Sequence, residues 1–309
     1  MLFPIYFAVF IIMILIVGLA VNAFITICNM KSWSRERKFK PSDKILTALC
    51  FIRFFLQCDF MMEIFGMWLE FIPLSEYKPR CIFYFIQVFM DFFSRWLGAW
   101  LSMLYYVKIT IFKNAFFLQL QTLIPRITGY VIFISVFISF APGLIYALSA
   151  KQGFCINAKG VNVTTNITSD LLTFRVISFF FGHSLPFMLE MLSSIYLLCT
   201  LLVHIRHTKS YVSNFTEPNM DAHWAVFRYI LLLNLMSMCN FFGNFFLWSF
   251  ISDYIGRGIG YFLAFSYPTS HSIVLILSNP KLRREIVNMF HCATNLWRFS
   301  KQDSETVTQ

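Results

Sequence analysis

Long apolar stretches alternate with short polar segments along the 309-residue chain. A helix needs about 20 mostly apolar residues to cross the hydrocarbon core of a bilayer. Seven stretches reach this length: 3–28, 45–71, 81–109, 126–149, 172–203, 225–250 and 256–278. The first is too long for the core of a signal peptide, and no stretch shows the alternation of a strand. The pattern predicts an all-α membrane protein, a seven-transmembrane helix bundle that occupies 1–279.

Basic residues give the expected orientation of these helices. The segments 31–44, 108–126 and 206–228 and the tail hold 6, 3, 3 and 5 of the 25 Lys and Arg residues, and the segments on the other side hold five. Since short basic loops stay in the cytosol, we expect an extracellular N-terminus and a cytosolic C-terminus in a multi-pass protein of the plasma membrane.

Glycosylation sequons agree with this orientation. Asn162 and Asn166 each begin one in the loop at 150–170, which the orientation makes extracellular. A third begins at Asn214, on the cytosolic side, and should stay unmodified.

Composition narrows the class of protein further. Hydrophobic residues make up 58% of the chain and charged residues 13%, far from the balance of a soluble domain. The net charge of +10 lies between apolar runs, so we expect membrane lipids rather than nucleic acid as the partner. We find no phosphate-binding glycine loop, metal cluster or nucleophile–base motif, and therefore expect no enzyme activity, no cofactor and no metal.

The third stretch has polar residues on one helical face. Their spacing of three or four residues brings them into line: Gln87, Asp91, Ser94, Gly98, Ser102 and Tyr105. Two interpretations remain open, a cavity lined by the stripe or a polar seam between helices. We favour the cavity for Gln87 and Asp91, which lie in the outer half, and packing for the lower residues. Asp91 either pairs with Arg95 or Arg175, is protonated, or holds a ligand amine.

Other polar residues lie at similar depths in different stretches. Asn22, Arg53 and Ser272 form one such level, and a buried guanidinium there needs acceptors from its neighbours. We predict a structural lock or switch, with Glu190 as a further partner.

Two longer motifs identify a family. Residues 101–112, at the end of the third stretch, resemble the LSxxYxxKIxxF signature of type 2 (bitter) taste receptors, and 271–282 resemble their HSxxLILxNxKL motif. Leu185-Pro186-Phe187 resembles their fifth helix, and 46–53 resembles their second helix with its Arg. The resemblance covers nearly the whole chain and includes Asn22, Tyr105, Lys108, His271 and Ser272.

The resemblance implies a G-protein-coupled receptor. Small-molecule bitter agonists enter an extracellular-facing pocket of helices 3, 5, 6 and 7, and a gustducin-type heterotrimeric G protein activates phospholipase C and releases calcium. Gln87 and Asp91 match the family's ligand residues on the third helix, where many members have Trp and Asn. We therefore expect a more acidic pocket and a bias toward cationic or hydrogen-bonding compounds. Residues placed by depth complete the predicted pocket: Ser178, Phe179, Gly182, Asn240, Asn244, Tyr261 and Phe265.

The resemblance also concerns the two membrane surfaces. Cys81 and Cys155 lie where many rhodopsin-class receptors have a disulfide that typical bitter receptors lack, so a bridge and two free thiols both remain open. On the cytosolic side we expect contact with the G protein from Lys108, Lys113, Arg206, Lys209 and Arg228. The tail, 280–309, should contain an amphipathic helix at about 281–292 on the inner leaflet.

Alternatives to this function also remain. Besides a bitter receptor, the chain could be another chemosensory receptor of the same fold, such as a pheromone-type receptor. A less favoured alternative is a proton- or cation-coupled transporter, in which Asp59, Glu63, Asp91 and Glu190 would form the ion path. The sequence leaves open whether the receptor forms oligomers.

Overall fold

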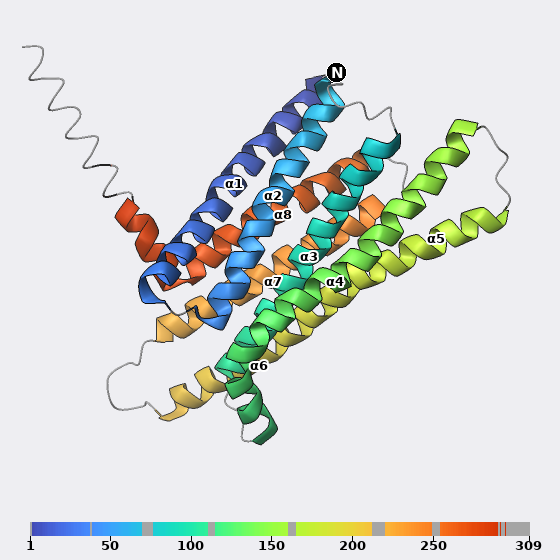
Figure 1. The fold of residues 1–309 in the computed structure, drawn as a ribbon. Coiled ribbons are helices and arrows are strands. Elements are labelled where there is room, and N and C mark those ends of the chain that lie inside the picture. Colours follow the sequence, from blue (N-terminus) through green and yellow to red (C-terminus); the bar gives the residue numbers. More distant parts are fainter. Residues whose placement is uncertain are drawn as a thin grey trace, which may run out of the picture.

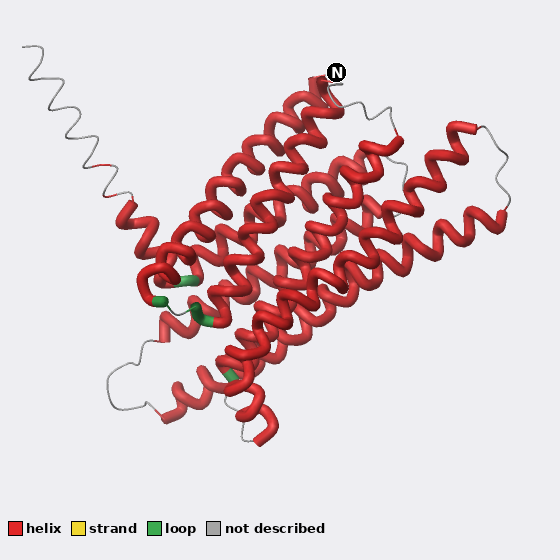
Figure 2. The backbone as a smooth tube through the Cα atoms, viewed as in Figure 1, coloured by secondary structure: helices red, strands yellow, loops and turns green. Residues whose placement is uncertain are grey.

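The protein is a bundle of long helices. The computed structural model describes residues 2–37, 39–69, 77–110, 115–159, 165–211, 220–248, 254–289, 291 and 294. The regular structure in these residues is helical throughout (Figures 1 and 2). The helices are α1 (Leu2–Glu36), α2 (Pro41–Leu69), α3 (Tyr77–Ile109), α4 (Ala115–Lys159), α5 (Thr165–Phe179), the π-helix η1 (Phe180–Ser184), α6 (Leu185–Tyr211), α7 (Met220–Trp248) and α8 (Tyr254–Ser278).

The helix α3 lies inside the bundle, where it contacts α2, α4 and α6. On one side of the bundle α1 packs against α2 and α8, and α7 packs against α8 and α6 (Figure 1). The segments α5, η1 and α6 follow one another without a break, so Thr165–Tyr211 is one rod with a π-helical turn inside it. This arrangement surrounds the polar stripe of α3 with neighbouring helices.

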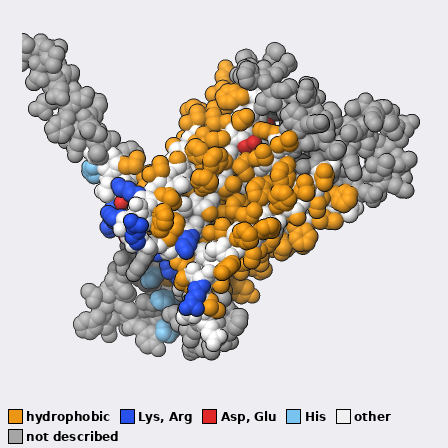
Figure 3. Space-filling model, in the orientation of Figure 1, with side chains coloured by type: hydrophobic (Ala, Val, Ile, Leu, Met, Phe, Trp, Pro, Cys, Tyr) orange, Lys and Arg blue, Asp and Glu red, His pale blue; other side chains and the backbone are white. Residues whose placement is uncertain are grey.

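The distribution of side chains is that of a protein in a lipid bilayer. Large apolar residues such as Tyr6, Phe133 and Phe137 are exposed on the outside, and Figure 3 shows a nearly continuous apolar surface over the middle of the molecule. Polar residues such as Arg53 and Gln57 are fully buried. Polar groups inside and apolar groups outside satisfy the hydrogen-bonding requirement of helices in lipid, so the predicted all-α membrane bundle is confirmed.

Length and hydropathy identify the helices that could span a membrane. In the described part of the chain, six helical segments are long and apolar enough to cross a membrane: Tyr6–Glu36, Pro41–Gly66, Thr122–Ile145, Leu172–His207, His223–Trp248 and Gly258–Ser278. The helix α3 is not among them, because Gln87, Asp91 and Arg95 lower its mean hydropathy. Its position inside the bundle explains how it tolerates these residues, and the count of seven spans stays a prediction.

Several helices continue beyond the expected membrane-length stretches. The helix α1 extends to Glu36 and α4 to Lys159, into segments that the sequence pattern assigned to loops. Hydropathy locates the apolar part of a helix, whereas backbone hydrogen bonding continues into polar residues until a helix-ending signal.

A further helical segment, 280–289, follows α8. Asn279 precedes it, and its Oδ1 accepts a hydrogen bond from the backbone N–H of Lys281 at 3.1 Å, as in an N-cap. Leu282 is fully buried in an apolar cluster with Ile25 and Leu46, which ties the segment to α1 and α2. Its position on a membrane surface and the domain limits 1–279 and 280–309 stay predictions.

Candidate functional site

Three groups of polar side chains in the described part of the chain concern the predicted site, and the first is centred on Arg53 of α2. The Arg53 side chain is fully buried. Its Nε donates to Ser94 Oγ at 3.0 Å and its Nη1 contacts His271 Nδ1 at 2.9 Å. A guanidinium has no acceptor atom, so Nδ1 of His271 must be the acceptor and carries no proton. The guanidinium also lies 5.1 Å from the ring centroid of Tyr267, a cation–π distance.

Asn22 of α1 continues this cluster. Its Oδ1 accepts from Ser272 Oγ at 2.8 Å, and its Nδ2 donates to Gln57 Oε1 at 3.0 Å. Gln57 in turn donates to Thr269 Oγ1 at 2.8 Å. We call these residues the inner network: Asn22, Arg53, Gln57, Ser94, Thr269, His271 and Ser272.

The inner network extends toward α6 and α7. Tyr267 Oη lies 3.3 Å from Ser237 Oγ, and Ser237 donates to Glu190 Oε1 at 2.6 Å. Glu190 is therefore connected to Arg53 through Tyr267 and Ser237 rather than by an ion pair. The connected residues belong to α1, α2, α3, α6, α7 and α8, so the network holds most of the bundle together.

Tyr105 and Lys108, the other two residues that carry the family resemblance on α3 and that we also expect to act as structural or switch residues, occupy different surroundings. Tyr105 is partly buried and lines a small cavity with Glu190 and His271, next to the inner network. Lys108 is exposed near the end of α3. The structure thus places Tyr105 close to the inner network and Lys108 at the end of the bundle.

The second cluster is centred on Asp91, one helical turn before Arg95 on α3. Arg95 Nη2 lies 3.1 Å from Asp91 Oδ1, and Arg95 Nε donates to Asp91 Oδ2 at 3.2 Å. Arg95 Nη2 also donates to Asn240 Oδ1 at 3.3 Å, and Asn244 Nδ2 donates to the same oxygen at 2.9 Å. Asp91 is therefore a paired carboxylate, and Arg95 connects it to α7.

Aromatic side chains and one histidine surround Asp91. His183 lies in the π-helical turn, is 1% exposed, and has its Nε2 3.8 Å from Asp91 Oδ2. Neither ring nitrogen of His183 has a hydrogen-bond partner in the described part of the chain. Three aromatic rings lie within about 5 Å of its ring: Phe92 at 5.0 Å, Phe179 at 4.9 Å and Trp248 at 5.2 Å.

A glycine permits this close packing. A Cβ at Gly182 would lie 2.3 Å from Cε1 of Phe92, so only glycine lets η1 approach α3 this closely. A π-helical turn inserts one extra residue and often occurs at functional sites. We call these residues the outer cluster: Asp91, Phe92, Arg95, Phe179, Gly182, His183, Asn240, Asn244 and Trp248.

A third group lies between α2 and α3. Gln87 Nε2 donates to Glu63 Oε2 at 2.6 Å. Asp59, one turn before Glu63, is buried, and its Oδ2 has no hydrogen-bond partner among the described residues. On the neighbouring helix α8, Phe265 stacks on Phe60 of α2 at 4.1 Å and touches Tyr261.

The predicted ligand residues thus fall into two groups. Asp91, Phe179, Gly182, Asn240 and Asn244 meet in the outer cluster. Gln87, Tyr261 and Phe265 lie on the side of α2, and Ser178 is buried with its hydroxyl unpaired in the described structure. Sequence reasoning missed His183 and Trp248 as members of the outer cluster. A histidine within the long apolar stretch 172–203 was the signal available for His183.

Some of the predicted sites belong to parts of the chain outside the described residues. Lys113 and Asn162 lie outside the described residues, and so do the side chains of Cys81, Cys155, Asn166 and Lys209. The disulfide and the glycosylation sites therefore stay predictions. Arg206 and Arg228 are exposed near the ends of α6 and α7, respectively, where contact with a partner is sterically open.

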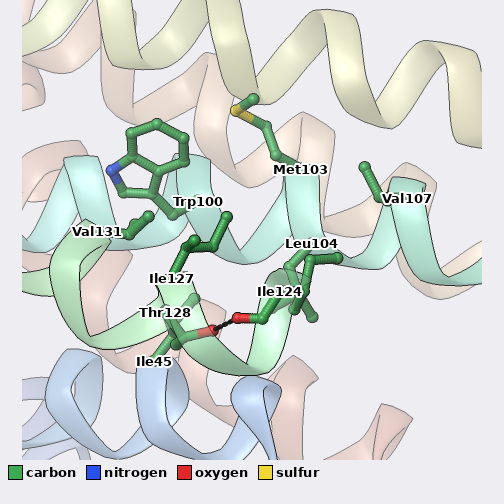
Figure 4. Close-up of a pocket in the computed structure, with 9 residues that line it drawn as sticks. All are labelled: Ile45, Trp100, Met103, Leu104, Val107, Ile124, Ile127, Thr128 and Val131. Carbon is green, nitrogen blue, oxygen red and sulfur yellow. Dashed lines mark hydrogen bonds between the residues drawn. The ribbon is translucent and has the colours of Figure 1, made fainter. Parts of the chain in front are cut away.

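An apolar cavity of about 110 Å³ lies apart from these clusters, between α2, α3 and α4. Figure 4 shows Trp100, Met103 and Leu104 of α3 on one side and Ile127 and Thr128 of α4 on the other. The Thr128 hydroxyl is occupied by a bond to the backbone oxygen of Ile124 at 2.6 Å (Figure 4). None of the predicted ligand residues lines this cavity.

Comparison with known proteins identifies the family. A family model described as "Taste receptor protein (TAS2R)" matches residues 1–294. Taste receptor type 2 member 39 of Macaca mulatta is 30% identical over 292 residues, which cover 89% of this chain and 83% of the relative. The human member 39 is 29% identical over 87% of this chain and 81% of the relative, and member 4 of Papio hamadryas is 28% identical over 86% and 90%. This chain belongs to the taste receptor type 2 family.

Proposed function

We propose that the protein is a bitter-taste receptor that couples to a G protein. Small-molecule agonists enter the outer half of the bundle and stabilise an active arrangement of helices. A gustducin-type G protein then activates phospholipase C and releases calcium. The observation that carries this proposal is the outer cluster. In it, an ion pair, two asparagines and a buried histidine without a hydrogen-bond partner among the described residues lie beside aromatic rings. Such a mixture of apolar walls and few polar groups is typical of small-molecule sites.

The charge of Asp91 decides which ligands fit. Because Arg95 contacts both carboxylate oxygens, an amine ligand would have to compete with Arg95 for Asp91 or add a second contact beside it. Neither ring nitrogen of His183 bonds to another described residue, so either could form a hydrogen bond to a ligand. The outer cluster therefore favours compounds that combine an aromatic body with hydrogen-bonding groups.

Acidic residues on α2 add to the preference for cations. Glu63 and Asp59 are buried, and no ion pair to either of them occurs among the described residues. Gln87 lies on α3 one turn before Asp91 and donates a hydrogen bond to Glu63 of α2. A ligand amine that approaches Gln87 would meet two buried carboxyl groups and would favour their ionised form by its positive charge, which supports the expected bias toward cationic compounds.

On the cytosolic side, we propose that the G protein meets the ends of α3, α6 and α7. The basic residues there are Lys108, Lys113, Arg206, Lys209 and Arg228. Their positive charge suits an acidic partner surface and raises the rate of encounter more than the final affinity.

The test is calcium release in cells that co-express this chain with a gustducin-type Gα chimera, screened with bitter compounds. Asp91→Asn and Glu63→Gln are run in parallel, with mock-transfected cells and surface staining as controls. We expect a dose-dependent response from the wild type and selective loss of cationic agonists in the variants. A wild-type receptor that reaches the cell surface but responds to no compound in the panel would contradict the proposed receptor function. Variants that keep every response to cationic agonists would contradict the proposed preference for cations.

A further inference from the structure

A polar cleft lies between the last turns of α1 and the segment 280–289, far from the outer cluster. Its volume is about 350 Å³, at the lower end of the range of ligand pockets, which is about 300–1,000 Å³. Figure 3 shows Lys and Arg side chains gathered at this end of the molecule, beside the broad apolar surface. The cleft is lined by Cys28, Lys31, Ser32, Arg35, Glu36, Pro280, Lys281, Arg284 and Glu285.

The walls of the cleft are firmly attached to the bundle. Leu282 is fully buried, and Ile286 packs against the same apolar cluster, which includes Ile25 of α1. Lys281 Nζ lies 3.5 Å from Asp43 Oδ2, which fixes the start of the segment to α2. The cleft is therefore a built feature of the fold rather than a gap beside a loose tail.

The charge of the cleft is positive. Four basic side chains line it against two acidic ones, Glu36 and Glu285. Lys31, Arg35 and Arg284 are exposed, and no ion pair to any of the three occurs among the described residues. Ser32 Oγ donates to Glu36 Oε1 at 3.3 Å, so this carboxylate has a partner within α1. With respect to the described residues, these three cations are therefore available to an anionic ligand.

The position of the cleft suits a lipid better than a soluble anion. Ile27 lies one helical turn before Lys31 on the same face of α1 and is 65% exposed. A ligand with a phosphorylated head beside Lys31 would thus place an apolar chain along Ile27 and the exposed apolar surface of α1. The orientation proposed above puts this end of α1 at the cytosolic leaflet, where anionic lipids attract basic segments.

We infer that this cleft binds the phosphorylated headgroup of an anionic lipid, a phosphoinositide, of the cytosolic leaflet. Arg35 of α1 and Arg284 of the segment 280–289 each bind two phosphate oxygens at once, because the planar guanidinium group matches the geometry of a phosphate. Binding would join α1 to the segment 280–289 and hold that segment at the membrane surface. The inference uses the proposed orientation but not the proposed ligand or G protein.

The test measures lipid retained by the purified full-length receptor with native mass spectrometry. The receptor is exposed separately to phosphatidylinositol bisphosphate, phosphatidylserine, phosphatidylcholine and soluble inositol trisphosphate. In detergent, added lipid can reach both ends of the helix bundle, so the result does not depend on the orientation of the receptor or on signalling. We expect selective retention of the bisphosphorylated lipid. Equal retention of phosphatidylserine, or equal binding of the soluble inositol phosphate, would overturn the inference of a phosphoinositide.

Matched variants locate the binding. Arg35→Gln with Arg284→Gln removes two charges from the cleft and should weaken binding roughly thirtyfold. Lys40→Gln with Arg126→Gln removes two exposed charges outside the cleft and should leave binding within about twofold. Glu36→Gln should strengthen it, because an acidic wall residue is neutralised. Equal weakening by the two double variants would show attraction by overall charge and contradict the cleft. Monodisperse elution of each variant verifies folding.

Discussion

Single residues decide how closely the helices of the inner network approach. A Cβ at Gly18 would lie 2.0 Å from Gln57 Nε2 and 2.1 Å from Thr269 Oγ1. The same two atoms form a hydrogen bond that connects α2 to α8. The absence of a side chain at Gly18 thus leaves space for the Gln57–Thr269 hydrogen bond. Asn22, one turn later, donates a hydrogen bond to the same Gln57 side chain.

Replacement of Gly18 by alanine tests this packing. Gly18→Ala should destabilise the receptor by about 1–3 kcal/mol, because the added methyl group forces the Gln57–Thr269 pair apart. The measurement is thermal unfolding of the purified receptor. Gly129→Ala is the matched control, since a Cβ there meets no atom within 4 Å. Equal stability of the two variants would show that the inner network tolerates the displacement.

The Arg53 guanidinium gives a second test. Arg53→Lys keeps the charge but loses the bond from Nε to Ser94 and the planar contact with Tyr267. We expect a loss of at least about 2 kcal/mol in stability, since hydrogen bonds from charged groups contribute about 1.5–3 kcal/mol each. Arg126→Lys, at an exposed position on α4, serves as the control. An unchanged unfolding midpoint for Arg53→Lys would mean that charge alone, and not geometry, matters at this position.

The sequence predicted part of the inner network. Asn22, Arg53 and Ser272 were expected at one depth, and the structure joins Asn22 to Ser272 at 2.8 Å. The part played by Gln57 was not predicted. Gln57 lies one turn after Arg53 on the same helical face, but that spacing does not specify its partners Asn22 of α1 and Thr269 of α8, which only the packing of the helices brings together.

At the scale of elements, the π-helical turn is the feature that the pattern could not predict. The stretch 172–203 is mostly apolar, and a π-helical turn within it leaves no mark on its composition. The turn nevertheless places Gly182 and His183 in the interior, against Phe92. The outer cluster therefore depends on a local backbone geometry that hydropathy does not encode.

A double-mutant cycle tests the contact between η1 and α3. Gly182→Ala should raise the agonist concentration for half-maximal response about tenfold, because its methyl group displaces the Phe92 ring. Phe92→Leu in the same chain should restore part of the response by removing ring atoms. Each variant is compared at matched surface expression. Additive effects of the two substitutions would contradict a direct contact that shapes the site.

The helix α3 shows why an element in the centre of a bundle is harder to predict as a span. Its ionic residues lower its hydropathy, although Asp91 and Arg95 compensate each other across one turn. Scales that sum single residues cannot represent this pairing. The polar stripe, which does depend on spacing, was the better guide to the interior face of α3.

For the whole molecule, the balance of apolar and polar residues was enough to predict a helical membrane bundle. The balance of apolar and polar residues did not predict which helices pack together, with α3 inside the bundle and α1 beside α8. Contacts such as Thr269 with the backbone of Ile14 join residues far apart in the chain. Such contacts require a three-dimensional arrangement that no local pattern specifies.

Orientation is testable at this scale through glycosylation. We expect Asn162→Gln with Asn166→Gln to abolish the mobility shift that glycosidase treatment causes in cell-expressed receptor, because both sites are predicted to be extracellular. Asn214→Gln should leave that shift unchanged, since its segment is predicted to be cytosolic. A shift that disappears only with Asn214→Gln would reverse the proposed topology.

The central claim is that this chain activates a G protein when a bitter compound binds in the outer half of the bundle. The most direct measurement is nucleotide exchange on a gustducin-type Gα by the purified receptor, with and without an agonist found in the cell screen. We predict that the agonist accelerates exchange and that Gly182→Ala lowers its potency while leaving the unstimulated rate unchanged. No acceleration by any agonist with folded receptor, or acceleration that Gly182→Ala leaves unaltered, would contradict the account.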